Sequence, residues 1–402
     1  MLFLQRQLDS CERSLAGLPS AFCVRYAGVL DETALARSFR LLCGRHPVLC
    51  ATIGPGHILS ASGEHCPELD AVDGDERDMY ELATGEWDNS RAVARLLLVR
   101  GNAEGFVVLR LDHAIADGSA YLALFAELWD LYTGIVDGRE IPERPGSSLP
   151  SSPSLLVWRY LGGVEPATVA APAPAGQTGC AARYRRIKLT SADTTALITA
   201  ARAANISVNA MISAAILLSL RGTGSTVMTV KSPVGLRTRV TPVVGATEAT
   251  NFTGGHTATV SVGDQDEPAA LGRRIKKQLD EGIARREFYI RGLLRMDLAD
   301  IGPSHNGSAL IVGINNHGVV PVFPQPAELD IVDFLWPGPQ PRQTGTIMSA
   351  DYRLHTYAGE LSIACHYPST RYSEAEVTRI VDGLVAQLVL IAGTAVAPSV
   401  TA

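Results

Sequence analysis

Residues 106–125, FVVLRLDHAIADGSAYLALF, place a histidine, an aspartate and a glycine between two apolar segments. The segment before Asp112 is rich in Val and Leu, which is typical of a buried strand. From Ser119 to Tyr132 the apolar residues recur at helical spacing and predict a long helix. The three polar positions therefore lie in a short turn that joins a strand to a helix.

The turn contains three residue types that can serve a reaction. His113, at the end of a buried strand, can be held in one tautomer while its other ring nitrogen meets a ligand. Asp117 lies close enough to the start of the helix to accept backbone N–H groups or to pair with an arginine. Gly118 is expected to supply a backbone conformation that a side chain would forbid. The pattern H-x-x-x-D-G is thus a candidate site for proton transfer.

The residues alone leave two other interpretations of this turn open. His113 could be a hydrogen-bonded core histidine, followed by an ordinary Asp-Gly turn. A metal site is also conceivable, because His and Asp four residues apart can share a helix face. The glycine and the preceding strand fit a metal site badly, and no companion pair of ligands is evident in the sequence. We therefore expect no metal.

Length and charge narrow the function further. A chain of 402 residues is long enough for two domains. Its net charge of −6 and its short basic runs argue against nucleic acid as a partner. The longest nearly continuous apolar run, Ala210–Leu220, is far shorter than the roughly 20 residues that span a bilayer, so we expect no membrane span.

The cysteines and the first residues indicate the compartment. Seven cysteines are an odd number, and none belongs to a C-x-x-C pair, which predicts reduced core cysteines. The first 15 residues turn charged after four positions and lack the apolar centre of a signal peptide. Both observations predict a cytoplasmic protein.

Composition divides the chain into two α/β halves. An Ala/Pro/Gly-rich stretch with little charge predicts a linker at 164–179, between an N-terminal half at 1–163 and a C-terminal half at 180–402. Periodicity predicts strands at 22–30, 48–53, 92–99, 105–111, 182–189, 227–234, 309–315, 345–354 and 360–366. It predicts helices at 32–45, 119–132, 155–161, 191–203, 209–221, 268–287 and 373–392.

The turn resembles the H-H-x-x-x-D-G signature of the chloramphenicol-acetyltransferase-like superfamily. That superfamily includes nonribosomal peptide condensation domains, plant acyl-CoA-dependent acyltransferases, wax ester synthases and polyketide-associated acyltransferases. Five further segments resemble parts of this family in its own order: 30–49, 206–221, 232–240, 314–318 and 354–377. Segment 30–49 resembles a first helix with an R-H-P-x-L turn, and segment 206–221 resembles a buried helix. Segment 232–240 resembles a strand with a fixed arginine, and segment 314–318 resembles an S-N-x-G strand end. Segment 354–377 resembles the closing strand pair with its helix. The similarity is greatest to the polyketide-associated acyltransferases.

The resemblance implies a fold and a set of roles. It implies two chloramphenicol-acetyltransferase-like subdomains, each an α/β sandwich, with a channel between them. His113 would be the general base, and Asp117 would be a structural partner of Arg237 beside Gly118. Asn316 and Gly318 match the S-N-x-G strand end and would lie near the channel. From its sequence alone, Arg237 could instead be a surface strand residue on the same face as Arg239.

The sequence departs from the family at several positions. Asp112 replaces the first histidine of the doublet, and we expect it to point away from His113, because adjacent strand residues face opposite sides. The segment 333–337, DFLWP, is a partial match to the plant D-F-G-W-G motif without its glycines, and we interpret it as a coincidence or a structural loop. His256, His317 and His355 have no motif support and are expected to be core or surface residues.

The function implied is acyl transfer from a thioester to a hydroxyl of a secondary metabolite or lipid. The donor would be acyl-coenzyme A or the phosphopantetheine arm of an acyl-carrier protein or polyketide synthase, with no tightly bound cofactor. No covalent enzyme intermediate is needed, because the thioester is already activated, and the absence of a G-x-S-x-G nucleophile motif agrees with this. An acidic carrier would need a basic patch, for which Arg183–Lys188 is the candidate.

Two rival functions remain. A free-standing condensation enzyme would form an amide or cyclise a carrier-bound substrate with the same histidine. A non-catalytic member of the superfamily would serve as a docking platform for other enzymes.

Overall fold

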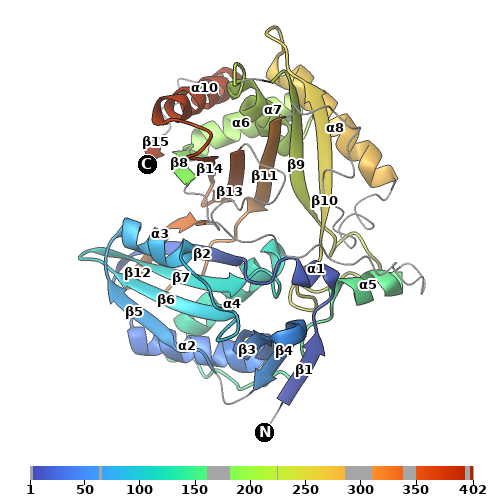
Figure 1. The fold of residues 1–402 in the computed structure, drawn as a ribbon. Coiled ribbons are helices and arrows are strands. Elements are labelled where there is room, and N and C mark those ends of the chain that lie inside the picture. Colours follow the sequence, from blue (N-terminus) through green and yellow to red (C-terminus); the bar gives the residue numbers. More distant parts are fainter. Residues whose placement is uncertain are drawn as a thin grey trace.

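The computed structural model consists of two layered halves, each a β-sheet covered by helices (Figure 1). It describes residues 3–62, 66–160, 182–223, 225–285, 310–337, 350–393 and 399–401. The expected linker at 164–179 lies outside the described residues. The mixed helix and sheet architecture predicted for both halves is confirmed.

The N-terminal half is built on a five-stranded sheet in the order β12-β2-β7-β6-β5. Its strands are β2 (Pro19–Gly28), β5 (Leu69–Asp73), β6 (Ala94–Arg100), β7 (Glu104–Asp112) and β12 (Leu329–Leu335). Its helices are α1 (Ser10–Arg13), α2 (Glu32–Arg45), α3 (Glu76–Thr84), α4 (Gly118–Val136) and α5 (Pro153–Tyr160). A small sheet in the order β1-β4-β3 joins β1 (Phe3–Gln7), β3 (Ala51–Gly54) and β4 (Ile58–Ser62).

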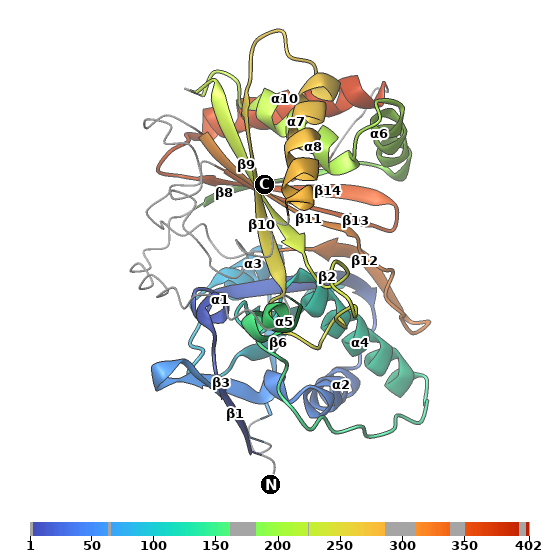
Figure 2. The same ribbon diagram turned by 90° about the vertical axis from the view of Figure 1, so that its right-hand side faces the viewer.

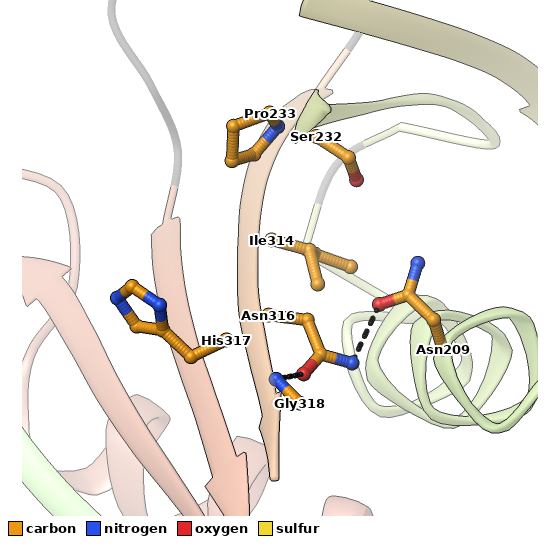
Figure 3. A pocket seen from close by; sticks show the side chains of 7 residues that line it. All are labelled: Asn209, Ser232, Pro233, Ile314, Asn316, His317 and Gly318. Carbon is orange, nitrogen blue, oxygen red and sulfur yellow. Dashed lines mark hydrogen bonds between the residues drawn. The ribbon is translucent and has the colours of Figure 1, made fainter. Parts of the chain in front are cut away.

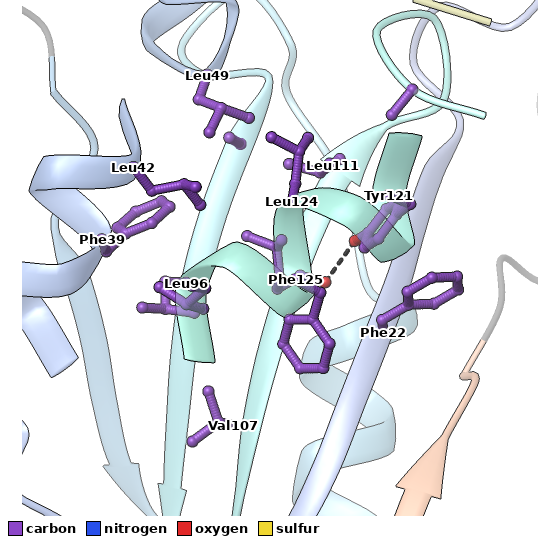
Figure 4. Close-up of a cluster of buried hydrophobic side chains, with 14 of the residues drawn as sticks. Phe22, Phe39, Leu42, Leu49, Leu96, Val107, Leu111, Tyr121, Leu124 and Phe125 are labelled. Carbon is purple, nitrogen blue, oxygen red and sulfur yellow. Dashed lines mark hydrogen bonds between the residues drawn. The ribbon is translucent and has the colours of Figure 1, made fainter. Parts of the chain in front are cut away.

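Both faces of the five-stranded sheet are buried, which explains why residues 106–109 of β7 are all apolar. Val107 and Leu109 belong to the core shared with α2 and α4, while Phe106 and Val108 pack with Met79 of α3. Figure 4 shows the first of these cores, where the Tyr121 hydroxyl lies within hydrogen-bonding distance of the backbone carbonyl oxygens of Ser20 on β2 and Leu109 on β7. Helix α4 is thereby fixed against the strand that ends at the candidate site.

The C-terminal half is built on a seven-stranded sheet in the order β10-β9-β11-β13-β14-β8-β15. Its strands are β8 (Ala182–Lys188), β9 (Val227–Gly235), β10 (Thr253–Ser261), β11 (Leu310–Val319), β13 (Ala350–Tyr357), β14 (Glu360–Pro368) and β15 (Ser399–Thr401). Helices α6 (Ser191–Ala203), α7 (Val208–Ser219), α8 (Pro268–Ala284) and α10 (Glu374–Ala392) gather on one face of this sheet (Figures 1 and 2).

One strand crosses from the second half of the chain into the first sheet. Strand β12 pairs antiparallel with β2, with Leu329 opposite Gly28 and Leu335 opposite Cys23. The predicted division into halves at 1–163 and 180–402 therefore does not include the contribution of β12, from the second half of the chain, to the sheet of the first half. The sequence analysis predicted no strand at these positions, and the alternate burial seen over the first half of β12 would not have shown which sheet receives it.

The predicted helix starts and ends are mostly close to those observed. Asp31 caps α2 by accepting from Ala34 N, and Ser373 forms a capping box with Glu376 at the start of α10. The strand predicted at 48–53 is wrong in its first part, because Pro47–Cys50 forms a 3₁₀ turn (η1) before β3 begins. Proline at the first position favours such a turn over a strand pairing.

No single described helix has the length and apolar composition needed to cross a membrane. Helices α6 and α7 meet those criteria only as a pair, and that pair is bent by 101°.

Candidate functional site

His113 begins the turn that follows β7, and its ring is oriented by that turn. Its Nδ1 lies 2.9 Å from the carbonyl oxygen of Ala116. Because a carbonyl oxygen can only accept, Nδ1 carries the proton in this arrangement and Nε2 is the basic nitrogen. The backbone is held as well: His113 N donates to Leu18 O (2.7 Å), and Asn251 Nδ2 from the second half donates to His113 O (3.3 Å).

Asp117 is buried at the first turn of α4 and joins the two halves. One carboxylate oxygen accepts from Ala120 N at 2.9 Å, which caps the helix. The other accepts from Phe252 N at 2.8 Å and from Arg237 Nη2 at 2.9 Å. The carboxylate is thus used entirely in holding α4 against the 236–252 segment.

Arg237 is a buried residue and not the surface strand residue that its sequence context allowed. It is 5% exposed and lies after the end of β9. Its guanidinium also donates to the carbonyl oxygens of Gly245 (2.8 Å) and Ala249 (2.9 Å). The ion pair with Asp117 therefore organises the whole 236–252 segment against the N-terminal half.

Gly118 is required for space, which corrects the expectation of an unusual backbone conformation. Its φ lies outside the left-handed region. A Cβ at this position would come within 2.1 Å of the His317 Cε1 atom. The glycine lets an imidazole from β11 lie directly against the start of α4.

His317 was expected to be an ordinary core or surface histidine, and the structure places it beside the candidate site. Its ring packs edge-on against Phe22 with centroids 4.9 Å apart, and against Trp336 at 4.0 Å. Among the described residues its Nε2 is buried without a hydrogen-bond partner. Burial, with Arg353 and His113 nearby, lowers the pKa of His317 to about 3. The ring is therefore neutral at pH 7.

A cavity of about 280 Å³ opens beside His317 in the C-terminal half (Figure 3). Its lining comes from α7, β9 and β11: Asn209, Ser232, Pro233, Ile314, Asn316, His317 and Gly318. Asn316 Nδ2 donates to Asn209 Oδ1 at 3.1 Å, and Gly318 N donates to Asn316 Oδ1 at 2.7 Å (Figure 3). Gly318 has φ of 74°, which favours glycine. The two residues singled out from the strand end thus lie on a cavity wall.

The sequence offered a weak signal for His317 and Asn209. His317 is the variable position inside the segment that ends at Gly318, and Asn209 lies at the start of a predicted helix. Neither position follows from spacing alone, because each acquires its neighbours only when α7, β9 and β11 come together.

Asp112 is a buried structural acceptor. Its carboxylate accepts from Gly17 N (2.7 Å), Ala114 N (2.9 Å), Trp87 Nε1 (3.2 Å) and Asn89 Nδ2 (3.1 Å). Burial raises the pKa of Asp112, and these donors oppose that effect. The residue ties the 17–18 and 87–89 segments to the turn that carries His113.

The DFLWP segment is structural, and most of it is strand instead of loop. Asp333, Phe334 and Leu335 belong to β12. Asp333 accepts from Arg186 of β8 at 2.6 Å, and the Phe334 carbonyl oxygen lies 3.0 Å from His355 Nε2 of β13. Both contacts join the two halves. Trp336 supplies the ring that packs on His317.

The remaining histidines without motif support lie in the core, as expected. His355 is 2% exposed, and burial lowers its pKa to about 3. His256 is also buried, on β10.

The stretch Arg183–Lys188 is not a free basic patch. Arg186 is buried and engaged by Asp333, and Lys188 Nζ lies 2.7 Å from Glu360. Arg183 and Arg185 both pair with Glu374. The positive charges that the sequence placed together are neutralised by acidic residues of neighbouring elements.

The geometry disfavours a metal at the His113 turn. The Asp117 carboxylate is already occupied by two backbone N–H groups and a guanidinium, so it cannot also serve as a ligand. Among the described residues the grouping of donor side chains that could hold an ion lies elsewhere, at Cys43, Cys50 and Cys66.

Comparison with known proteins gives the family context. Residues 178–366 match the family model described as the phthiocerol/phthiodiolone dimycocerosyl transferase C-terminus. The chain is 27% identical over 350 residues to a phthiocerol/phthiodiolone dimycocerosyl transferase of Mycobacterium ulcerans, covering 78% of this chain and 80% of the relative. It is 28% identical over 304 residues to the Mycobacterium leprae protein of that name, covering 68% and 72%.

Solved structures share the fold over nearly the whole length. Polyketide synthase associated protein 5 from Mycobacterium tuberculosis superposes with a TM-score of 0.76 at 22% identity, covering 97% of this chain and 98% of that one. Trichothecene 15-O-acetyltransferase from Fusarium sporotrichioides gives 0.72 at 13% identity, covering 97% and 95%. The first condensation domain of the calcium-dependent antibiotic synthetase gives 0.67 at 17% identity, covering 97% of each. The chain therefore shares the fold of these condensation domains and acyltransferases, and its sequence is similar to the phthiocerol/phthiodiolone dimycocerosyl transferases.

Proposed function

We propose that this protein transfers an acyl group from a thioester to a hydroxyl group of a lipid or secondary metabolite, with His113 as general base. The relatives in sequence are named transferases, and the matched family model carries the same name. The donor is a coenzyme A or phosphopantetheine thioester, and the product is an ester. We place the reaction in the cytoplasm, because the chain has an odd number of cysteines and no C-x-x-C pair.

The orientation of the His113 ring carries this proposal. The Nδ1···Ala116 O contact of 2.9 Å fixes the tautomer in which Nε2 accepts a proton. Nε2 takes the hydroxyl proton as the oxygen attacks the thioester carbonyl carbon. The tetrahedral adduct then collapses, the C–S bond breaks, and the leaving thiolate takes the proton back from the imidazolium. No covalent enzyme intermediate is required, because the thioester is already activated.

The two neighbouring histidines are not equivalent as bases. A general base works best when its pKa lies near the working pH, and His317, with a pKa of about 3, is too weak. A neutral His317 also adds no positive charge beside the imidazolium that forms on His113. The surroundings of the two histidines therefore support His113 as the general base and His317 as part of the cavity wall.

The substrates occupy the interface between the halves in this proposal. His113 and Asp117 come from the N-terminal half, while Asn251, Arg237 and the cavity wall come from the C-terminal half. At about 280 Å³ the cavity is near the lower limit for small-molecule sites, and it fits a slender acyl or pantetheine segment. Asn316 and Gly318 would line the path of that segment.

The test is turnover of an acyl-CoA with an alcohol. Octanoyl-CoA and 1-octanol serve as probes, with octylamine in a parallel reaction, and mass spectrometry identifies ester, amide and free acid. His113→Ala should lower ester formation roughly a hundred to ten-thousandfold, the range that general-base catalysis contributes. His57→Asn is the matched control, because His57 is exposed and its left-handed backbone suits asparagine.

Three results would decide between this proposal and its rivals. Equal turnover by wild type and the folded His113→Ala protein would exclude His113 as the base. Amide as the main product would favour condensation chemistry. Wild-type protein that binds a carrier or synthase but never turns over a thioester would favour a docking platform.

A further inference from the structure

We propose that Cys43, Cys50 and Cys66 form a binding site for a thiophilic d¹⁰ metal ion, Zn(II) or Cu(I), in the N-terminal half. The three Sγ atoms all lie within 4.8 Å of one another. This inference does not depend on the proposed acyl transfer, because none of the three cysteines belongs to the His113 turn or to the cavity.

Three different segments bring the thiols together. Cys43 lies in the last turn of α2 and is 1% exposed. Cys50 is the last residue of η1, and Cys66 lies between β4 and β5. Because η1 packs on β4 and follows directly on α2, the three segments are already adjacent in the fold. Little rearrangement is needed to assemble the site.

The spacing suits a metal–thiolate centre. A Zn–S bond of about 2.3 Å places the sulfurs of a tetrahedral site roughly 3.8 Å apart. The observed limit of 4.8 Å therefore requires each pair to close by about 1 Å or less. Thiolate sulfur is the ligand type that selects Zn(II) and Cu(I) over harder ions. Three sulfurs alone suit Cu(I), whereas Zn(II) would take a fourth donor such as water.

A metal ion from solvent can reach the three cysteines. Cys50 and Cys66 are partly exposed, so an ion can enter and a fourth ligand can reach it. Cys43 is buried and supplies the inner ligand. A bound ion would tie the end of α2 to η1 and to the connection after β4. The expected consequence is stabilisation of this corner of the N-terminal half.

The experiment is a competition titration of the reduced, metal-free protein. Zn(II) and Cu(I) are titrated in separate arms against chromophoric chelators, and Co(II) is added in a third arm to detect thiolate-to-metal charge transfer. We expect one equivalent bound with a Kd below about 1 µM in at least one of the first two arms, and fewer thiols accessible to a thiol reagent. The thermal unfolding midpoint should rise with the metal bound.

Variants identify the ligands. Cys50→Ser and Cys66→Ser should each weaken binding at least about tenfold and abolish the charge-transfer band. Cys23→Ala is the control, because Cys23 is a buried free cysteine on β2 outside the cluster. Thermal unfolding of the metal-free variants shows whether each one still folds.

The proposal is overturned if neither ion binds more tightly than about 1 µM, or if binding of the same strength survives in the Cys50→Ser and Cys66→Ser proteins. It is also overturned if the reduced protein binds no metal while air oxidation joins two of the three cysteines in a disulfide. None of these three results involves acyl transfer, so failure here and failure of the proposed function are distinguishable.

Discussion

At the scale of single residues, the His317 ring occupies the volume that a side chain at position 118 would need. The Gly118 backbone, the Phe22 ring and the Trp336 ring enclose this imidazole on several sides. A small residue in the H-x-x-x-D-G turn is therefore explained by a neighbour on a strand some 200 residues later in the chain. This contact joins the turn that carries His113 to the wall of the cavity.

Gly118→Ala tests that contact. The added methyl would force the His317 ring to move, and overpacking of this kind costs about 1 to 3 kcal/mol. His317→Ala removes the obstacle, so the double variant should be more stable than the sum of the two single effects predicts. Urea unfolding of the four proteins in this cycle measures the coupling.

Gly44→Ala provides the control for Gly118→Ala. Gly44 is a helical glycine in α2 with open space around its Cβ position, so alanine there should be neutral or slightly stabilising. Additive effects of Gly118→Ala and His317→Ala would mean that the close approach of the ring does not determine the glycine.

At the scale of elements, the carboxylate of Asp117 at the start of α4 has two structural roles. Asp117 caps the helix through Ala120 N and pairs with Arg237 across the interface. Loss of an N-cap alone costs about 1 kcal/mol, whereas breaking a buried ion pair from one side costs about 3 to 5 kcal/mol. The ion pair should therefore dominate the effect of any substitution at this position.

Asp117→Ala should accordingly destabilise the protein by about 3 to 5 kcal/mol. The matched control is Ser373→Ala, which removes the cap of α10 without an ionic partner and should cost about 1 kcal/mol. The double variant Asp117→Ala with Arg237→Met should recover part of the loss, because no charge is then left buried alone. Unfolding free energies in urea measure all four proteins. Equal losses in Asp117→Ala and Ser373→Ala would contradict a structural role for the ion pair.

The elements show what local sequence can and cannot predict. The β7–α4 unit was predicted within a few residues, because apolar runs, capping residues and turn residues act locally. The 3₁₀ turn at Pro47–Cys50 was missed, since the apolar residues at 48–49 fit a strand equally well. Strand β12 was missed altogether, since 333–337 was interpreted as a coincidental match or a structural loop, and alternation would in any case define a face but not a partner strand.

In the candidate site, too, residues that are close in the chain were predicted together, whereas residues that only the fold brings together were not. His113, Asp117 and Gly118 share one short motif and were found together in the sequence. Arg237 was found only through the family resemblance, and its burial comes from the 236–252 segment folding over it. His317 was missed, because its neighbours belong to elements that are distant in the chain.

At the scale of the whole molecule, buried polar contacts connect the two halves at separate places. Asp117 and Arg237 form one of them, and Thr250 donates to the buried Glu12 nearby. The other is centred on β12, where Asp333 meets Arg186 and the Phe334 carbonyl oxygen meets His355. A site built from both halves depends on their relative position, so these contacts set the geometry around His113.

Asp333 should make this connection sensitive to acid. Burial alone would raise the pKa of Asp333, but Arg186 and Lys188 outweigh burial, so the pKa lies below its ordinary value. A depressed folded-state pKa means that the ion pair stabilises the protein fully above the unfolded pKa of about 3.9. That contribution is lost as the pH falls from about 4 through the folded-state value.

Asp333→Asn tests both the size and the pH dependence of this link. At pH 7 the variant should be less stable by about 3 to 5 kcal/mol, because Arg186 remains buried without its carboxylate partner. The deficit should stay constant down to about pH 5 and shrink below about pH 4, where Asp333 of the unfolded wild type takes up a proton while the folded protein still holds the carboxylate ionised. Urea unfolding at several pH values measures it, with Asp70→Asn as the control, since Asp70 pairs with Arg95 on the exposed surface. Tryptophan fluorescence reports the four tryptophans Trp87, Trp129, Trp158 and Trp336, all of which lie in the N-terminal half or directly after β12. It should separate from far-UV circular dichroism in the Asp333→Asn protein if the halves unfold independently. A deficit that is the same at pH 7 and pH 3.5 would show that the charge of Asp333 does not hold the halves together.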